Sequence, residues 1–197
     1  MIIDISRPLD ESLAVFPGDV SFTRSRTMRM DRGDSCNVSA LAASAHAGTH
    51  VDLPLHYSSD ETLPDLGVFV GPATVIAVDD WEELSSHQVK PGRRVLFKTR
   101  NSSNSSSNFD NDFFCIDSSV VECLVEMQAV LIGVDGPSVD PVTSTTLDNH
   151  HALHRAGITI LENLDLLQVE PGDYELIALP LKIPGADATW VRAVLRR

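Results

Sequence analysis

Apolar residues along this chain recur either at alternate positions or in short unbroken runs, and both patterns are typical of β-strands. Residues 20–30 alternate loosely between apolar and polar side chains, which predicts a half-buried strand, and residues 37–45 predict a strand of small residues. The continuous apolar runs at 73–78, 94–99 and 129–134 predict buried strands. The last of these runs is the most hydrophobic strand in the chain.

The remaining periodic segments predict a few helices among further strands. Asp80 is suited to cap a short helix over 81–87, and Asp117 or Ser118 to cap a helix that ends at Gln128. A third helix, over 145–156, is closed by a following glycine. The other predicted strands are 2–5, 158–161, 174–180 and 190–195. Roughly eight strands and three helices predict a strand-rich α/β fold with a mixed sheet.

The length and composition predict one globular domain over residues 1–197. The chain has 43% hydrophobic residues and a mean hydropathy near zero, which suits a protein with a core of its own. Residues 101–112 are polar and rich in serine and asparagine. Because such a segment cannot bury enough apolar surface to fold alone, we expect a mobile loop within the domain.

Charge and cysteine content limit the partners and the compartment. Aspartate and glutamate number 28 against 15 lysines and arginines, a formal net charge of −13. Nucleic acids and anionic membranes need a basic surface, so neither is expected as a partner. The N-terminus lacks the pattern of a signal peptide, no apolar run approaches the ~18 residues of a membrane span, and three cysteines without a CxxC pair indicate reduced thiols. We therefore expect a cytoplasmic protein.

The candidate chemistry is concentrated in residues 46–56. Three histidines and one aspartate occupy even positions there: His46, His50, Asp52 and His56. In an extended strand these side chains would project to one side, but the segment would then span roughly 33 Å at about 3.3 Å per residue. The four groups can meet at one ion only if the chain bends, and Gly48 and Pro54 are where it could.

Imidazole and carboxylate together suit zinc, manganese or iron, whereas the alternative interpretation is a buried polar network. The chain has no GxSxG elbow, Walker loop or GxGxxG turn, so the usual serine hydrolase, NTPase and dinucleotide sites are not indicated. A metal that lowers the pKa of water and polarises a carbonyl makes hydrolysis of an amide or ester the leading reaction. His56, beyond Pro54, is the natural candidate for general acid/base catalysis.

Other candidate residues lie outside this segment. The helix over 145–156 carries His150, His151 and His154, and a single glycine separates it from the strand that leads to Glu162, so the helix and strand can bring His150 and Glu162 together. Asp135, at a strand end, could hold a partner in the site or cap a turn. Phe16 lies on a Pro-Gly turn, which has either a purely structural role or presents the ring to a pocket.

The motif His46-x-Gly-Thr-His50-x-Asp52-x-Pro-x-His56 resembles the signature of the cyclase-like metal-dependent hydrolases, whose best-known members are the bacterial kynurenine formamidases (arylformamidases). The likeness extends along nearly the whole chain, and the flanking blocks favour the formamidase branch. Those blocks are 4–9, 16–19, 37–39, 133–140, 157–163, 172–180 and 191–195.

The resemblance implies roles for seven residues. His46 and His50 would bind a first zinc, Asp52 and Glu162 would bridge two ions, and His150 would complete the second site, with His151 as its rival. His56 would move the proton, and Phe16 would lie against the ring of the substrate, where the family usually has tryptophan. The family also implies a swivelling β/β/α domain, two divalent ions (zinc, or else manganese) and a homodimer in which residues of the partner complete the pocket.

The activity that the resemblance implies is zinc-dependent hydrolysis of a linear amide, N-formyl-L-kynurenine, to L-kynurenine and formate in tryptophan degradation, with a metal-bridged hydroxide as nucleophile. Gly136 and Trp190 depart from the family pattern, as Phe16 does, and each could reshape the pocket. The alternatives are a related hydrolase of a cyclic amide or lactone, isatin-like in shape, and an inactive metal-bound binding protein of the same fold.

Overall fold

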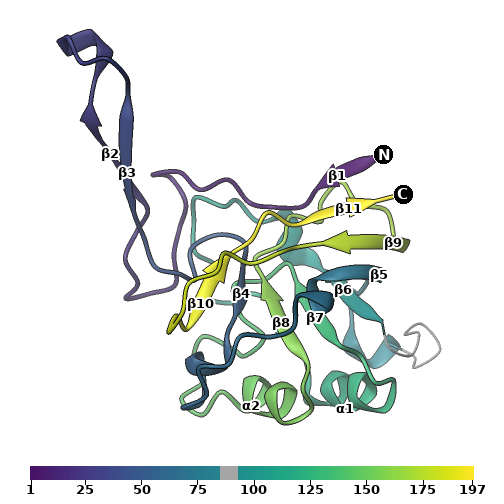
Figure 1. The fold of residues 1–197 in the computed structure, drawn as a ribbon. Helices are drawn as coiled ribbons and strands as arrows, with labels where there is room; N and C mark the ends of the chain where they lie inside the picture. Colours follow the sequence, from purple (N-terminus) through teal and green to yellow (C-terminus); the bar gives the residue numbers. More distant parts are fainter. Residues whose placement is uncertain (85–92) are drawn as a thin grey trace.

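The computed structural model describes residues 1–84 and 93–197 (Figure 1). Nine of its strands form one mixed sheet in the order β1-β11-β9-β5-β6-β7-β8-β4-β10. The strands are β1 Ile2–Asp4, β4 His50–Asp52, β5 Val70–Ala77, β6 Arg94–Lys98, β7 Leu131–Val134, β8 Thr159–Glu162, β9 Gly172–Ile177, β10 Ala188–Trp190 and β11 Val194–Arg196. The α/β class with a mixed sheet is therefore confirmed.

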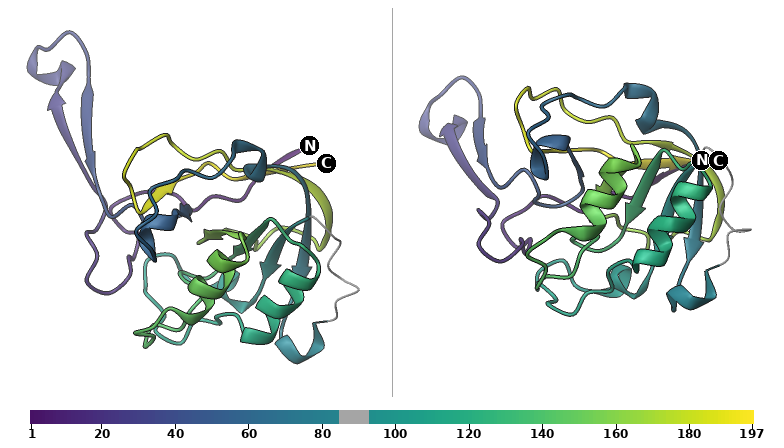
Figure 2. Two further views of the ribbon diagram at one scale, coloured as in Figure 1. Left: turned by 60° about the horizontal axis from the view of Figure 1, so that its bottom comes forward. Right: turned by 90° about the horizontal axis from the view of Figure 1, so that it is seen from below.

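Two helices, α1 (Ser118–Glu126) and α2 (Asp148–Arg155), lie side by side against one face of the sheet (Figure 2). They cover the parallel strands β5 to β8. The connection from β6 to β7 contains α1, and the connection from β7 to β8 contains α2. Successive side chains of a strand point to opposite faces of the sheet, so β6 contributes apolar residues to both faces. Val95 and Phe97 pack beneath the helices with Leu124, whereas Leu96 lies in the core on the other side of the sheet.

The ends of both helices follow from local sequence. The Asp117 carboxylate accepts a hydrogen bond from the backbone N–H of Ser119 at 2.8 Å, so Asp117 is the N-cap of α1. Gly157 follows α2 with φ +70°, a conformation that glycine adopts without strain. The helix itself is shorter than predicted, because α2 begins only at Asp148.

The second core lies on the face of the sheet away from the helices. It is formed by residues of β4 to β9 and β11 together with residues of the loops, and its largest members include Phe69, Leu96 and Leu161. This core packs closely against β7. A Cβ atom on Gly133 would lie 2.4 Å from Leu96 Cδ2 and 2.8 Å from Leu164 Cδ1.

Replacing Gly133 with alanine is therefore expected to lower the free energy of unfolding by about 1–3 kcal/mol, the usual cost of overpacking a core. Both colliding side chains are fully buried, so they have little room to move aside. Urea denaturation of the two proteins measures the difference. An unchanged unfolding midpoint would contradict the packing described here.

A hairpin of β2 (Thr23–Met28) and β3 (Val38–Ala42) stands apart from the sheet and projects from the body (Figure 1). The prediction that residues 20–30 form a half-buried strand is wrong: the strand exists, but five of its six residues are exposed. All five residues of β3 are also exposed. Alternation shows which side chains share a face, but it does not show whether that face is covered. Within residues 1–84 and 93–197, no segment buries either face of the hairpin.

Other predicted elements differ in extent. The segment 190–195 is not one strand, because β10 pairs with β4 at one end of the sheet and β11 pairs with β9 nearer the other end. Of the helix predicted over 81–87, residues 81–83 form one 3-10 turn, η4, which ends before Leu84, and residues 85–87 lie outside the described part of the chain. The 3-10 helices of the described residues are η1 Met30–Arg32, η2 Pro54–His56, η3 Leu66–Phe69, η4 Trp81–Glu83 and η6 Arg100–Ser103. None of the helices within 1–84 and 93–197 is long and apolar enough to cross a membrane.

Candidate metal centre

Pairing between β4 and β8 sets the centre of the site. The two strands are antiparallel, with His50 opposite Glu162 and Val51 opposite Leu161. Alternation therefore sends Val51 and Leu161 into the core and places His50 beside Glu162 on the other face. His50 Nε2 lies 3.4 Å from Glu162 Oε2, and both residues are buried.

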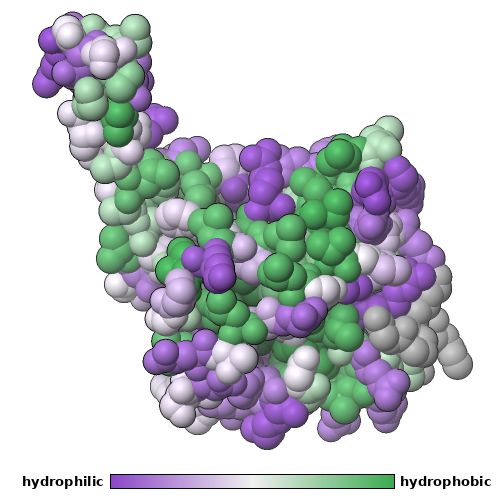
Figure 3. Space-filling view, in the orientation of Figure 1, coloured by the Kyte–Doolittle hydropathy of each residue, from purple (hydrophilic) through white to green (hydrophobic). Residues whose placement is uncertain are grey.

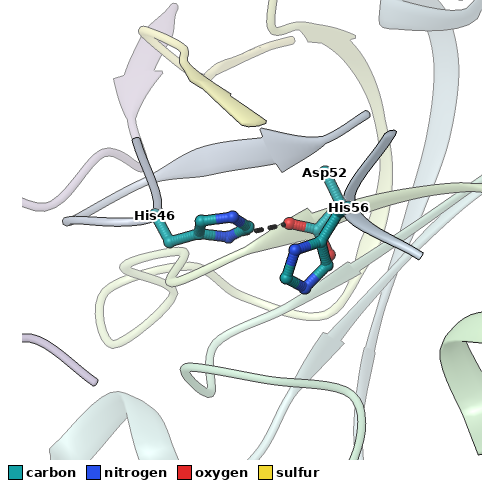
Figure 4. A group of neighbouring side chains, drawn as sticks. All are labelled: His46, Asp52 and His56. Carbon is teal, nitrogen blue, oxygen red and sulfur yellow. Dashed lines mark ion pairs between the residues drawn. The ribbon is translucent and has the colours of Figure 1, made fainter. Parts of the chain in front are cut away.

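The chain bends on both sides of β4, as predicted from Gly48 and Pro54. Gly48 has φ +67°, and a Cβ there would lie 2.8 Å from the Leu9 side chain, so this bend requires glycine. Pro54 opens the 3-10 turn η2, which ends at His56. The two bends bring His46 and His56 together, with 4.3 Å between their ring centroids (Figure 4).

Asp52 is the residue around which the imidazoles gather. Its Oδ1 lies 3.2 Å from His46 Nδ1 and 3.3 Å from His50 Nε2, and its Oδ2 lies 3.3 Å from His150 Nε2. His150 comes from α2 and is also 3.7 Å from Glu162 Oε1. The structure thus brings together all five residues predicted as ligands.

His151 and His154 are not part of this cluster. Their rings lie 6.5 Å and 5.0 Å from the ring of Tyr57, on the partly exposed side of α2. Of the histidines on this helix, only His150 reaches Asp52 and Glu162 within hydrogen-bonding or ion-pairing distance. His150 therefore occupies the position for which His151 was the rival.

The atoms of the cluster fit a bound cation. Both oxygens of Asp52 are buried and accept no hydrogen bond, although three imidazole nitrogens lie close to them. His50 Nδ1 donates to the Gly48 carbonyl at 2.9 Å, so its Nε2 is left to face the two carboxylates as a lone-pair donor. Such unpaired buried oxygens are costly unless a cation binds them.

The pKa values of the clustered residues also indicate that the two carboxylates favour positive charge beside them. Burial disfavours the charged ring of His50, but the close negative charges of Asp52 and Glu162 outweigh burial and raise its pKa to about 10. The pKa of His150 is also raised to about 10, against the effect of burial, chiefly by Asp140 and Asp52. Burial and the neighbouring charge of Asp52 raise the pKa of Glu162.

Two groups of side chains in the described part of the chain could each hold one ion. His50, Asp52 and Glu162 form one group, and His46, Asp52 and His56 form the other, with the ligand atoms of each within 4.8 Å of one another. Asp52 belongs to both groups and could bridge two ions. His56 therefore has two candidate roles, ligand and proton carrier. Its pKa is lowered by burial and by the neighbouring rings of His46 and His150.

Two carboxylates that the sequence interpretation missed orient the candidate ligands. Asp140 Oδ2 lies 2.6 Å from His150 Nδ1, and Asp187 Oδ2 lies 3.1 Å from His46 Nε2. Asp140 also accepts the backbone N–H groups of Asn149 and His150 at the start of α2. Asp140 belongs to a sequence block already singled out for the family resemblance, whereas no sequence signal marks Asp187.

Replacing Asp140 with alanine is expected to weaken metal binding by about 10- to 100-fold, because an outer carboxylate fixes the ring of a ligating histidine. Competition with a coloured chelator measures the affinity. The control is Asp148→Ala, an exposed aspartate in the first turn of the same helix, which should bind metal as wild type does. Equal affinities for both variants would show that Asp140 does not orient His150.

Asp135 performs the turn-capping role that was one of its two predicted alternatives. Its carboxylate accepts hydrogen bonds from the backbone N–H and hydroxyl of Thr99 and of Ser102, and from the amide of Asn101. The carboxylate is therefore fully occupied in closing the turn η6. Its backbone carbonyl accepts a hydrogen bond from the Arg7 guanidinium at 3.1 Å.

A cavity of about 250 Å³ opens beside the cluster. His46, His56, His150 and Glu162 line one side, and Phe16 lines another. The Phe16 ring packs edge to face against Phe109, with 5.3 Å between centroids. The serine- and asparagine-rich segment thus forms part of the cavity wall, while its mobility remains a prediction.

The other two departures from the family pattern lie outside the lining of this cavity. Gly136 lets the Asn101 side chain approach closely, since a Cβ there would be 2.8 Å from Asn101 Nδ2. Trp190 lines a second, adjoining cavity together with Arg7 and Leu181. Of the three departures, Phe16 alone contributes directly to the space beside the cluster.

Relatives of known name match almost the whole chain. A kynurenine formamidase from Geobacillus thermodenitrificans is 42% identical over 99% of this chain and 97% of its own length. A kynurenine formamidase from Delftia acidovorans is 39% identical over 98% of this chain and 96% of its own. The sequence similarity therefore includes every element that positions the cluster.

Solved structures show the same fold. A protein from Bacillus stearothermophilus described as a predicted metal-dependent hydrolase superposes with a TM-score of 0.85 at 25% identity, over 99% of this chain and 97% of that one. Isatin hydrolase A from Labrenzia aggregata superposes with a TM-score of 0.81 at 23% identity, over 99% of this chain and 93% of that one. The model of the family Cyclase ("Putative cyclase") matches residues 3–141. This chain belongs to the Cyclase family.

Proposed function

We propose that the protein is a metal-dependent amidohydrolase that cleaves N-formyl-L-kynurenine to L-kynurenine and formate in tryptophan degradation. The observation that carries this proposal is the cluster of three imidazoles and two carboxylates at the edge of a cavity that an aromatic ring also lines. The names and nearly full-length match of the formamidase relatives support the choice of substrate.

In this proposal His46, His50, Asp52, His150 and Glu162 hold two divalent ions, zinc or else manganese. A bound divalent cation would polarise the formyl carbonyl and lower the pKa of water at the site. Asp52 directs Oδ1 toward His46 and His50 and Oδ2 toward His150, which favours a carboxylate shared by two ions over a single ion. Asp140 and Asp187 keep the rings of His150 and His46 in place.

His56 is assigned the proton transfer. Its pKa is lowered by burial, so the ring is neutral near pH 7 and can accept a proton before passing it to the departing aniline nitrogen. The ring lies between those of His46 and His150, at 4.3 Å and 5.5 Å, and it lines the cavity where the substrate would sit. Phe16 and Phe109 offer aromatic surface to the aryl ring of the substrate.

Steady-state rates on N-formyl-L-kynurenine and on isatin test the proposal against its enzymatic rival, which the isatin hydrolases among the solved structures of this fold suggest. We expect a much larger kcat/KM for N-formyl-L-kynurenine. Preference for isatin would replace the proposed substrate, and no turnover of either would favour a binding protein. Metal analysis of the purified protein, followed by chelation and addition of zinc or manganese, tests the number and identity of the ions.

We also propose that the protein is a homodimer in which the β2–β3 hairpin contacts a second copy. Apolar side chains are exposed along the hairpin and its base (Figure 3), namely Val20, Met30, Val38 and Leu41. A two-stranded hairpin is barely stable alone. It carries four arginines, Arg24, Arg26, Arg29 and Arg32, in a chain of net charge −13, so the acidic body of a second copy is a complementary partner.

Sedimentation analysis tests this assembly. Wild type should sediment as a dimer, and Leu41→Glu, which places a charge among the exposed apolar side chains, should shift it toward monomer. Thr27→Glu is the matched control on the same hairpin. A monomeric wild type would contradict the dimer, and a dimeric Leu41→Glu variant would place the interface elsewhere.

A cytoplasmic setting is the last part of the proposal. Cys36, Cys115 and Cys123 are all free thiols, as expected for a reducing compartment. Fractionation of the producing cells would test the location.

A further inference from the structure

Arg7 is held at the edge of the candidate metal centre by its backbone. Its N–H donates to Thr49 Oγ1 at 2.8 Å, and the Thr49 hydroxyl donates to the carbonyl of Asn163 at 2.7 Å. Thr49 precedes His50 and Asn163 follows Glu162, so two candidate ligands are direct chain neighbours of these bonds. The position of Arg7 relative to the cluster is therefore fixed by secondary structure on both sides.

The guanidinium of Arg7 has most of its donors unused. Nη2 donates to the Asp135 carbonyl at 3.1 Å, Nε is buried without a partner, and Nη1 has no hydrogen-bond partner among the described residues. Arginine offers five N–H donors in a rigid fork. Unlike the buried Nε, Nη1 is not among the atoms shielded from solvent. Arg7 lines both the cavity beside the cluster and the adjoining cavity with Trp190, so an acceptor where the two meet could reach this free end.

The charges around the cavity single out Arg7. Among the described residues that line it, Arg7 is the one side chain with a permanent positive charge. The acidic lining residues cannot attract an anion. Two of them already accept hydrogen bonds within the protein: the Asp19 carboxylate from the Ser44 hydroxyl, and the Asp110 carboxylate from the Asn104 amide. An anionic group on a ligand in this cavity therefore has Arg7 as its electrostatic partner, apart from the candidate metal centre itself.

We infer that Arg7 binds the carboxylate of the substrate and so makes the site selective for aryl amides that carry an acidic side chain. The inference rests on the proposed function, in which N-formyl-L-kynurenine carries an amino-acid carboxylate remote from its formyl group. With the formyl group at the metal centre, the carboxylate would accept hydrogen bonds from the open end of the Arg7 fork. Isatin and simple aryl formamides have no such group.

Two substrates separate this role from a structural one: N-formyl-L-kynurenine, and 2′-formamidoacetophenone, which keeps the aryl formamide and ketone but lacks the amino-acid end. For Arg7→Gln, we expect KM for N-formyl-L-kynurenine to rise about 10- to 100-fold with kcat within about twofold. Both constants for 2′-formamidoacetophenone should stay within about twofold of wild type. Arg7→Lys, which keeps the charge but not the fork, should give an intermediate KM.

Controls keep the test decisive. Arg196→Gln removes an exposed arginine outside the cavity that pairs with Glu175, and it should behave as wild type on both substrates. Thermal unfolding checks that each variant is folded. If Arg7→Gln does not fold, Arg7→Lys takes its place in the test, because lysine retains a donor for the Asp135 carbonyl. An equal loss on both substrates, or no loss on either, would overturn the inference.

Calorimetric binding makes the inference independent of turnover. L-Kynurenine should bind wild type more tightly than 2-aminoacetophenone, and Arg7→Gln should remove the difference. If wild type cleaves neither formamide, the proposed function fails, but this comparison still decides the role of Arg7. Equal binding of the two ligands by wild type would exclude it.

Discussion

His56→Ala is expected to lower kcat on N-formyl-L-kynurenine by about 10²- to 10⁴-fold, the usual contribution of general acid/base catalysis, while the metal content stays at the wild-type level. The physical reason is that His56 lines the cavity and its ring contacts those of His46 and His150. The five proposed ligands remain in place without it. Kinetics and elemental analysis on the same preparation measure both quantities.

The alternative role for His56 is that of a metal ligand, because His56 belongs to one of the two groups of side chains that could hold an ion. If His56→Ala lost metal together with activity, His56 would be a ligand and not the proton carrier. His151→Ala is the matched control, because His151 lies on α2 outside the cluster and near Tyr57. It should keep both its metal and its turnover.

Asp52→Asn is expected to lose both bound metal and activity, and to lose more metal affinity than the about 10- to 100-fold predicted for the outer carboxylate Asp140. Asp52 is shared by both groups of potential ligands, so its replacement affects both. A neutral amide cannot supply the negative charge that balances a divalent cation. Metal titration of the variant, monitored by calorimetry, gives the number of sites and their affinities.

The control for this substitution is Asp60→Asn, which changes an exposed aspartate just beyond the motif. It should bind metal and turn over substrate as wild type does. Retention of two ions at wild-type affinity by Asp52→Asn would show that Asp52 bridges nothing, and the proposed two-metal site would have to be abandoned.

Several local features could be predicted from neighbouring residues alone. The bends at Gly48 and Pro54, the cap at Asp117 and the glycine stop after α2 all depend on the conformational limits of one or two residues. The gathering of His46, His50 and Asp52 follows from those bends. These features depend on steric limits between residues that are adjacent in the sequence. They can therefore be predicted without knowing the fold, and the structure confirms them.

Features that depend on distant segments were missed or misjudged. Residues 20–30 have the alternation of a half-buried strand, yet the hairpin that they form is exposed, because alternation does not reveal whether anything packs on a face. Asp187 approaches His46 from a segment 141 residues away. The polar loop around Phe109 was predicted as mobile from composition, and its place in the cavity wall depends on how the chain folds over the cluster.

Hydrophobic periodicity and side-chain chemistry are local properties, so they were enough to predict the α/β class, the buried strands and the residues that could bind metal. Which of these groups meet depends on the tertiary structure. His50 faces Glu162 because β4 and β8 pair in one antiparallel register, and His150 reaches Asp52 because α2 packs beside them. Pairing and packing join segments about 100 residues apart, and their geometry depends on the whole core.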